Sequence, residues 1–250
     1  MAGTSVILLP GVVLPAALAY SALVASLGDS FECVPKELEV YADPEPPTGY
    51  GLDTEVEGIA RTALKSGFDR FHLVGYSGGG AASLAFASTY PDRLLSLALL
   101  EPAWAGNEGL GPEERALWME FDRIKGLPPD QRMPAFMRAQ VAPDTPLPPP
   151  PEGPPPPWMA QRPAGVVAVL EAFPKFRLNL DRLRDFERPV YYALGGRSNP
   201  DYFVRQADRL ATVFPDFTVD VFAERHHFDP PHRAEPDRLA AALTKMWTRT

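Results

Sequence analysis

The chain has 250 residues, a length that suits one large domain or a domain that carries an insertion. Its formal net charge of −8 argues against nucleic acid or an anionic membrane surface as the main partner, and favours a small neutral or hydrophobic molecule. The single cysteine, Cys33, excludes an intrachain disulfide, so a reducing, cytoplasmic location is expected. The oligomeric state is left open by the sequence.

The first 28 residues carry no charged side chain, which resembles a signal peptide or a membrane helix. No basic residue precedes the apolar stretch, and Pro10 and Pro15 interrupt it, so neither interpretation holds. We expect instead a buried strand at Val6 to Leu9 and a buried helix from Ala16 to Leu27.

Strand and helix patterns alternate through the next part of the chain. Thr54 and Glu57 form a capping-box pair that predicts a helix up to about Ser66, after a turn-rich loop at 44–51. An alanine-rich helix is expected to end before Pro91. The predicted strands are a weak one at 34–41 and two apolar ones at 71–74 and 94–100.

The alternation breaks at Trp104 and resumes near residue 189. Helices are predicted between these points at 113–125, 133–141, 164–173 and 178–186. Ten prolines between 143 and 157 exclude helix and central strand there, so this segment should be extended and stiff.

The final third returns to strands and helices. Strands are expected at 189–194 and 218–222, with a helix capped by Asn199 and Pro200 between them and a closing helix at 235–247. The sequence therefore predicts an α/β fold with a mostly parallel sheet and helices on both faces. The core is assigned to 1–103 and 189–250, and a helical cap insertion to 104–188.

One motif carries the strongest chemical signal. Gly75-Tyr76-Ser77-Gly78-Gly79 matches Gly-x-Ser-x-Gly and lies between an apolar strand and a small-residue helix, which is the context of a nucleophile elbow. The glycine spacings typical of phosphate-binding loops are absent. Ser77 is therefore the candidate nucleophile.

A serine hydroxyl needs a base, and histidine is the usual one near neutral pH. The chain has four histidines. His72 lies inside a predicted strand and is interpreted as structural, whereas His226, His227 and His232 all follow the last predicted strand.

These features resemble the α/β-hydrolase superfamily, particularly its serine-dependent, esterase-like members with a small helical cap. The resemblance covers nearly the whole chain and implies a triad in the order serine, acid, histidine. The histidine then lies just after the final strand, where His227 matches best and His226 is the alternative.

The family most often carries its acid after the strand that here ends at Gly195, but Ser198 stands at that position. Some members place the acid one strand earlier, where Glu101 ends an apolar strand. A carboxylate there is costly to desolvate without a partner, which favours Glu101 as the acid, with Asp201 as the fallback.

The resemblance also implies two backbone donors for an oxyanion, the amides of Gly78 and Val12. In the loop after the first strand, Pro10 stands where the family usually has a histidine. The hydrogen bonds that this histidine would make to support the loop are therefore not expected, but the Val12 amide can still donate. Candidate walls of the substrate pocket are Tyr76, Trp104, Trp118 and Phe136.

The expected activity is hydrolysis of an ester, thioester or lactone of a small hydrophobic substrate through an acyl-enzyme, with no metal or organic cofactor. One alternative is a His/Asp metal-dependent hydrolase, because His226, His227, Asp229 and His232 lie within seven residues. Another is a protein of the same fold that only binds a ligand or partner, since fold alone does not imply activity.

Overall fold

Six strands form one sheet in the order β2-β1-β3-β4-β5-β6, and each of the five strand pairings is parallel. This computed structural model describes residues 4–106, 109–147 and 153–249. The central strands are buried along nearly their whole length, as expected for apolar runs covered on both faces. The strands are β1 (Thr4–Leu9), β2 (Phe31–Pro35), β3 (Phe71–Tyr76), β4 (Leu94–Leu100), β5 (Val190–Gly195) and β6 (Phe217–Phe222).

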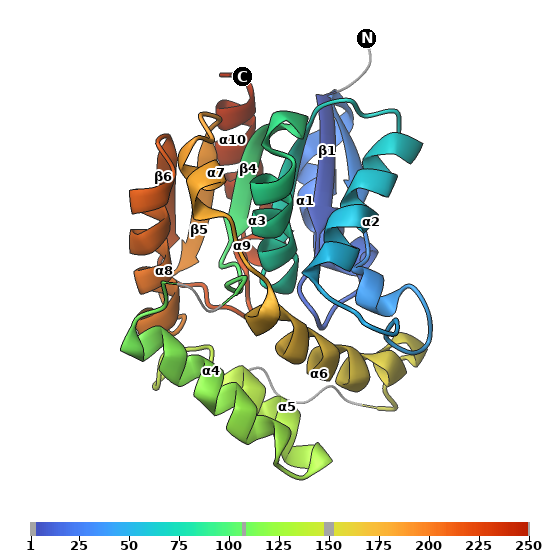
Figure 1. Cartoon of the computed structure of the whole chain (residues 1–250), viewed down its shortest axis with the longest axis vertical. Coiled ribbons are helices and arrows are strands. Elements are labelled where there is room, and N and C mark those ends of the chain that lie inside the picture. The colour runs from blue at the N-terminus through green and yellow to red at the C-terminus, as the bar shows by residue number, and fades with distance from the viewer. Residues whose placement is uncertain (1–3, 107–108, 148–152, 250) are drawn as a thin grey trace.

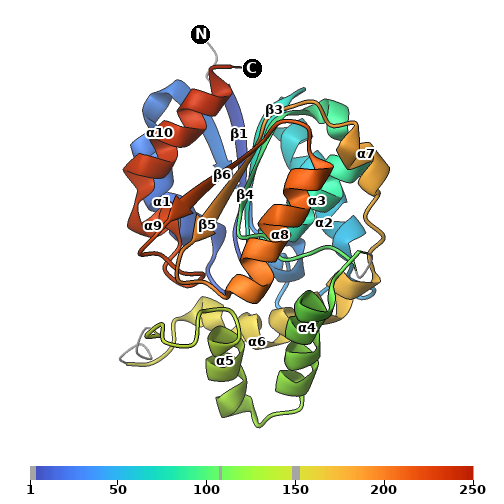
Figure 2. The same cartoon turned by 90° about the vertical axis from the view of Figure 1, so that its left-hand side faces the viewer.

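Helices cover both faces of the sheet, as Figure 2 shows with the sheet seen nearly edge-on. One face carries α1 (Ala16–Leu27), α9 (Pro231–Ala234) and α10 (Pro236–Trp247), and the other carries α2 (Leu52–Lys65), α3 (Gly78–Thr89), α7 (Leu180–Arg184) and α8 (Pro200–Val213). The predicted α/β architecture is confirmed. In the part of the chain that the structure describes, no helix combines the length and apolar character needed to cross a membrane.

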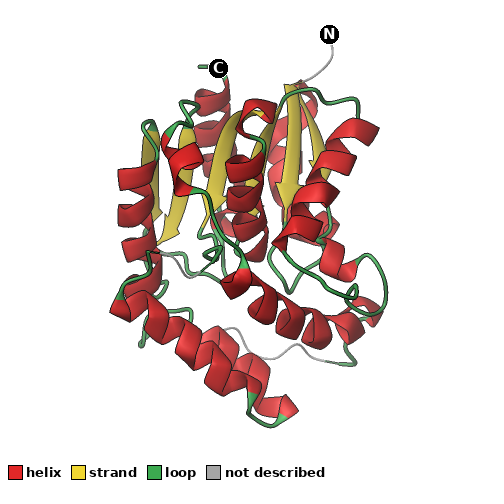
Figure 3. Ribbon diagram, in the orientation of Figure 1, coloured by secondary structure: helices red, strands yellow, loops and turns green. Residues whose placement is uncertain are grey.

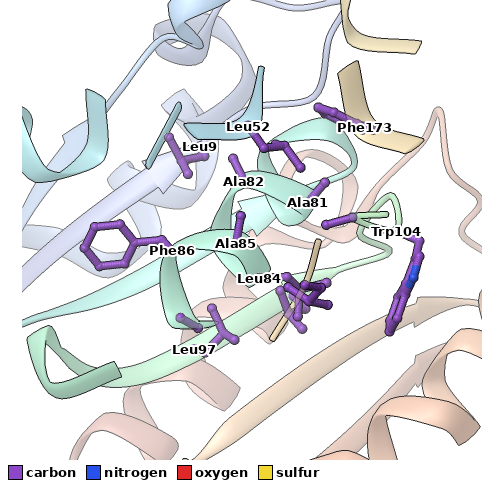
Figure 4. Close-up of a cluster of buried hydrophobic side chains, with 14 of the residues drawn as sticks. Leu9, Leu52, Ala81, Ala82, Leu84, Ala85, Phe86, Leu97, Trp104 and Phe173 are labelled. Atoms are coloured by element: carbon purple, nitrogen blue, oxygen red, sulfur yellow. The ribbon is translucent and has the colours of Figure 1, made fainter. Parts of the chain in front are cut away.

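Helix α3 is the central helix of its layer, and its glycine and alanine residues let it approach the sheet closely. Eleven of its twelve residues are buried. Leu9 of β1, Leu97 of β4 and Phe173 from the inserted segment surround it (Figure 4). This packing fixes the helix N-terminus, and with it Ser77, against the carboxyl ends of β1, β3 and β4.

The inserted segment lies across the carboxyl edge of the sheet, toward which the strand arrows point (Figures 1 and 3). Its helices at this edge are α4 (Pro112–Lys125), α5 (Pro129–Arg138) and α6 (Arg162–Ala172), whereas α7, which also lies within 104–188, packs against α3 and α8 of the core. An ion pair between the buried Glu114 and the partly buried Arg209 joins α4 to α8. On α6, the guanidinium of Arg162 lies 3.8 Å from the centre of the Tyr41 ring, so both ends of the segment contact the core.

The predicted strand at 34–41 is wrong in its second half. Strand β2 ends at Pro35, and Glu39–Tyr41 forms a short 3₁₀ helix. The Glu55 carboxylate accepts hydrogen bonds from the amides of Glu39 at 2.9 Å and Val40 at 3.2 Å. A side chain of α2 thus takes the donors that a longer strand would have paired with β1.

The predicted capping box is also wrong. Helix α2 begins at Leu52, whose side chain is buried, and the Thr54 hydroxyl accepts from the Gly51 amide at 3.4 Å. Glu57 is exposed and lies 3.7 Å from Arg61, one turn further along the helix. Burial of the apolar Leu52 side chain therefore starts the helix two residues before the predicted cap.

The insertion helices are shifted or shortened relative to prediction. The helix expected at 133–141 is α5 and runs from Pro129 to Arg138, because the residues after it pair with the loop that follows β5. The helix expected at 178–186 is the five-residue α7. In the proline-rich segment, 143–147 and 153–156 are irregular and a 3₁₀ helix begins at Pro157, while 148–152 lie outside the described residues.

Candidate active site

Ser77 stands at the sharp turn between β3 and α3. Its backbone has a φ of 52°, a strained conformation that costs a non-glycine residue about 1–3 kcal/mol. Its neighbours hold the turn, because the Ser77 amide donates to the Leu100 carbonyl at 3.2 Å and its carbonyl accepts from the Ala103 amide at 2.8 Å. The turn places the hydroxyl at the carboxyl edge of the sheet.

Two glycines allow this turn to close. A Cβ on Gly75 would lie 2.3 Å from the Ser83 hydroxyl oxygen, and one on Gly79 would lie 2.5 Å from the Leu9 carbonyl oxygen. Both separations are far inside van der Waals contact. The glycines of the motif are therefore needed for the close approach of α3 to the sheet.

His227 lies in the loop after β6, and its ring spans the gap between Ser77 and Glu101. Its Nε2 is 3.0 Å from the Ser77 Oγ, and its Nδ1 is 3.1 Å from the Glu101 Oε2. The ring is buried and stacks on Phe203, with 4.7 Å between centroids. The Tyr76 hydroxyl donates to the His227 carbonyl. Three contacts thus hold the imidazole itself, and the fourth holds the backbone of the same residue.

Glu101 directly follows β4 and is buried, with a positive φ of 44°. A buried carboxylate is costly unless hydrogen bonds compensate it. Here its Oε1 accepts from the Gly195 amide at 2.7 Å, and its Oε2 faces His227. Each oxygen therefore has a partner, and the strained backbone aims the carboxylate at the imidazole.

The alternatives named from the sequence lie elsewhere. Asp201 is exposed in the first turn of α8. The Ser198 hydroxyl is buried and finds no partner among the described residues. His226 is half-buried, burial lowers its pKa, and its Nδ1 accepts from the Phe228 amide at 3.2 Å. None of the three contacts Ser77 or His227 through a hydrogen bond that the structure describes.

The two remaining histidines are structural. The His72 Nδ1 lies 2.8 Å from the Ser96 hydroxyl, and burial lowers the pKa of His72 to about 4. His232 packs between the rings of Tyr20 and Tyr76, at 4.9 and 4.8 Å, and burial lowers its pKa to about 3. Both rings therefore stay neutral near pH 7. The interpretation of His72 as a strand residue with a hydrogen-bonded side chain is confirmed.

The histidine-rich loop does not form a ligand cluster. Asp229 accepts from the Arg225 guanidinium at 2.6 Å, and the rings of His226, His227 and, on α9, His232 lie in separate surroundings. Within 4–106, 109–147 and 153–249, no three His, Cys, Asp or Glu side chains gather as metal ligands would. The described residues therefore give the metal-dependent alternative no site.

The loop after β1 brings Val12 beside Gly78. A Cβ on Gly78 would lie 2.7 Å from a Val12 methyl carbon, so the two residues are in direct contact. The Tyr41 hydroxyl donates to the Val12 carbonyl at 2.6 Å, and the Glu37 carboxylate accepts from the Ala16 amide at 3.3 Å. These two side chains bind the backbone of the loop and of the start of α1 that follows it.

A small cavity of about 30 Å³ opens onto Ser77. Aromatic and aliphatic groups form most of its wall. The lining residues are Val12, Ser77, Gly78, Ala103, Trp118, Phe121, Phe136, Gln140, Val166, Val169, Leu170 and Phe173.

Two of the four predicted pocket walls, Trp118 and Phe136, line this cavity, but Tyr76 and Trp104 do not. The prediction is wrong for these two. The Tyr76 side chain lies under the histidine loop, between His227 and His232. Trp104 is fully buried, and the guanidinium of Arg209 lies 5.3 Å from the centre of its ring. Both aromatics pack within the core.

Several residues of the site were not predicted from the sequence, and Tyr41 and Gln140 are two of them. Tyr41 supports the Val12 loop from 29 positions further along the chain, and Gln140 lines the cavity from the end of α5. Neither residue belongs to a motif, and no hydrophobic periodicity around either position predicts where its side chain points. Only the packed fold brings them to Ser77.

The fold and this geometry define an α/β-hydrolase type of protein. A sequence profile of the alpha/beta hydrolase family matches residues 6–242, so the chain belongs to this family.

Solved structures agree with this assignment. A carboxylesterase structure from the thaumarchaeon Nitrososphaera gargenis superposes with a TM-score of 0.73 at 18% identity, covering 98% of this chain and 90% of that chain. An esterase from Thermogutta terrifontis gives 0.70 at 19% identity, with 99% and 90% covered. A proline iminopeptidase from Mycobacterium smegmatis gives 0.64 at 18% identity, with 98% and 89% covered. These superpositions establish the fold and, at such low identities, nothing about the substrate. The activities named for the three structures also differ from one another.

Proposed function

We propose that this protein is a serine hydrolase that cleaves an ester, thioester or lactone bond of a small hydrophobic substrate. One observation carries the proposal. The Ser77 hydroxyl, the His227 ring and the Glu101 carboxylate form a continuous line, with 3.0 Å from Oγ to Nε2 and 3.1 Å from Nδ1 to Oε2. A nucleophile within reach of a base that is oriented by a third group is the arrangement used for acyl transfer.

In this mechanism Ser77 attacks the acyl carbonyl while the His227 Nε2 takes the hydroxyl proton. The Glu101 carboxylate, hydrogen-bonded to Nδ1, stabilises the imidazolium that forms. His227 then returns the proton to the leaving group, which departs and leaves an ester on Ser77. Water, deprotonated by the same histidine, attacks this ester and restores the free hydroxyl.

The amides of Val12 and Gly78 are proposed to stabilise the oxyanion. Both residues line the cavity with Ser77. Among the hydrogen bonds of the described residues, none uses either amide as a donor. Donors positioned in this way favour the tetrahedral intermediate over the planar substrate, which is the main source of rate enhancement in acyl transfer.

The apolar wall of the cavity supports a hydrophobic substrate. Trp118 and Phe121 come from α4, Phe136 comes from α5, and Val166 and Leu170 come from α6. An acyl group that enters between these helices exchanges water for aromatic and aliphatic contacts.

Labelling with a fluorophosphonate tests the nucleophile. We expect one adduct per chain, located by mass spectrometry on the peptide that contains Ser77, and a parallel loss of ester hydrolysis. Ser77→Ala should take up no label, while Ser83→Ala should label normally because Ser83 is buried within α3, where its hydroxyl donates to the Gly79 carbonyl. A wild type that neither labels nor cleaves short esters would instead favour a binding protein of this fold.

The support of the Val12 loop gives a second prediction. Tyr41→Phe removes the donor to the Val12 carbonyl, so kcat for a short-chain ester should fall about tenfold while KM changes little. Tyr191→Phe is the matched control, because the Tyr191 hydroxyl donates to Asp220 at 3.0 Å and, among the described residues, has no contact with the loop or with the segment that carries Tyr41. Steady-state kinetics measure the effect, and an equal loss in both variants would assign Tyr41 a general role in stability.

A further inference from the structure

Gln140 is the one side chain besides Ser77, among the described residues that line the cavity, that carries a hydrogen-bond acceptor. It follows α5 and is 5% exposed. The Trp118 indole N–H, buried and without a partner among the described residues, can only donate, and the remaining lining side chains are apolar. A single carboxamide in an apolar wall is a group that fixes the orientation of a ligand.

The hydrogen bonds of the carboxamide determine which of its atoms is available. The Gln140 Nε2 donates to the Phe136 carbonyl at 3.0 Å, and this carbonyl requires the nitrogen on its side. In the part of the chain that the structure describes, no donor reaches the Oε1. The oxygen is therefore free to accept a hydrogen bond from a ligand that enters the cavity.

The backbone around Gln140 is fixed to the core. Its carbonyl accepts from the Asn199 amide at 3.0 Å, and the Ala142 amide donates to the Arg197 carbonyl at 2.9 Å. The Asn199 side chain donates to the Ala139 carbonyl at 2.8 Å, and Val141 forms a bridge with Ser198. The loop after β5 therefore anchors this end of α5, and Gln140 keeps its position relative to Ser77.

We propose that Gln140 is a specificity-determining residue, which selects esters that carry a hydroxyl or amide N–H on the part that lies under the inserted segment. This inference rests on the proposed function. The substrate would be apolar over most of its surface, with one donor facing the Gln140 Oε1. A site that hydrogen-bonds a substrate hydroxyl discriminates against analogues that lack it, because its own buried group is then unpaired.

Matched esters test this inference. Methyl 3-hydroxybutanoate and methyl 6-hydroxyhexanoate are compared with analogues in which a methyl or a methoxy group replaces the hydroxyl, and 2-hydroxyethyl butanoate is compared with propyl butanoate and 2-methoxyethyl butanoate. For at least one set, kcat/KM of the wild type should be about 10 to 100 times higher with the hydroxyl. The methoxy analogues keep the oxygen and lose only the donor, so they should behave as the methyl analogues do.

Gln140→Met keeps the length and shape of the side chain and removes the acceptor. The preference should fall to near unity, mainly through loss of activity on the hydroxyl ester, while fluorophosphonate labelling reports that Ser77 is still reactive. Phe136→Leu, in the same wall, is the control, and it should change both members of a pair alike. If Gln140→Met does not fold, the comparison of hydroxyl with methoxy esters in the wild type still decides the matter.

The outcomes separate this inference from the proposed function. Hydrolysis of all esters without preference for a hydroxyl, or a preference that persists in Gln140→Met, would overturn the role of Gln140 and leave the serine hydrolase intact. Failure to cleave any ester, together with an unlabelled Ser77, would overturn the proposed function itself.

Discussion

Glu101→Gln is expected to lower kcat for ester hydrolysis by about 10⁴-fold, with a much smaller change in KM. The substitution keeps the size of the side chain and an oxygen that can accept from Gly195. Its amide group, however, donates toward the His227 Nδ1, which forces the proton of the ring onto Nε2. In that tautomer the ring cannot accept the Ser77 proton, and no negative charge is left to stabilise an imidazolium.

The control for this experiment is Asp201→Asn. Asp201 is exposed at the start of α8, so kcat should change by no more than about twofold. Both variants are assayed on the same short-chain ester, and thermal unfolding shows that each is folded. A large loss in Asp201→Asn together with normal turnover in Glu101→Gln would overturn the choice of Glu101.

The meeting of Ser77, Glu101 and His227 could be anticipated because each follows a strand of one parallel sheet. The carboxyl ends of parallel strands share an edge, so residues 126 and 150 positions apart in the chain come together once the strand order is fixed. Strand polarity and a short motif are local properties of a sequence. They are enough to predict the carboxyl edge of the sheet as the place of the site and the turn at Ser77 as the place of its nucleophile, without any knowledge of side-chain packing.

Side-chain direction is a different matter. Tyr76 precedes the nucleophile and Trp104 follows β4, so both lie near the site along the chain. Yet the Tyr76 ring packs on His227 and His232, and Trp104 contacts Arg209. Which way an aromatic side chain turns depends on neighbours from distant elements, and hydrophobicity alone does not encode it.

The same reason hides the residues that support the site. The donor to the Val12 carbonyl comes from the 3₁₀ helix at Glu39–Tyr41, a segment whose apolar character predicted a strand. Glu55, on α2, binds the amides of that segment and so determines its shape. The sequence pattern of residues 34–41 alone does not predict that a carboxylate from α2 binds the amides of this segment.

His227→Ala should reduce kcat by about 10⁵ to 10⁶-fold and should also abolish fluorophosphonate labelling of Ser77. The imidazole is the one base within 3.0 Å of the Ser77 hydroxyl in the described structure, so its removal leaves the hydroxyl proton without an acceptor. The loss should fall on kcat, because the ring does not line the cavity that receives the acyl group.

His226→Ala is the matched control for the adjacent ring. The His226 ring accepts from the Phe228 amide and does not reach Ser77, so its loss should loosen the loop and lower kcat by no more than about tenfold. Labelling of Ser77 should persist in this variant at a reduced rate. If His226→Ala abolished labelling and His227→Ala left it intact, the base would have to be reassigned to His226, with the loop rearranged in solution to bring that ring to the serine.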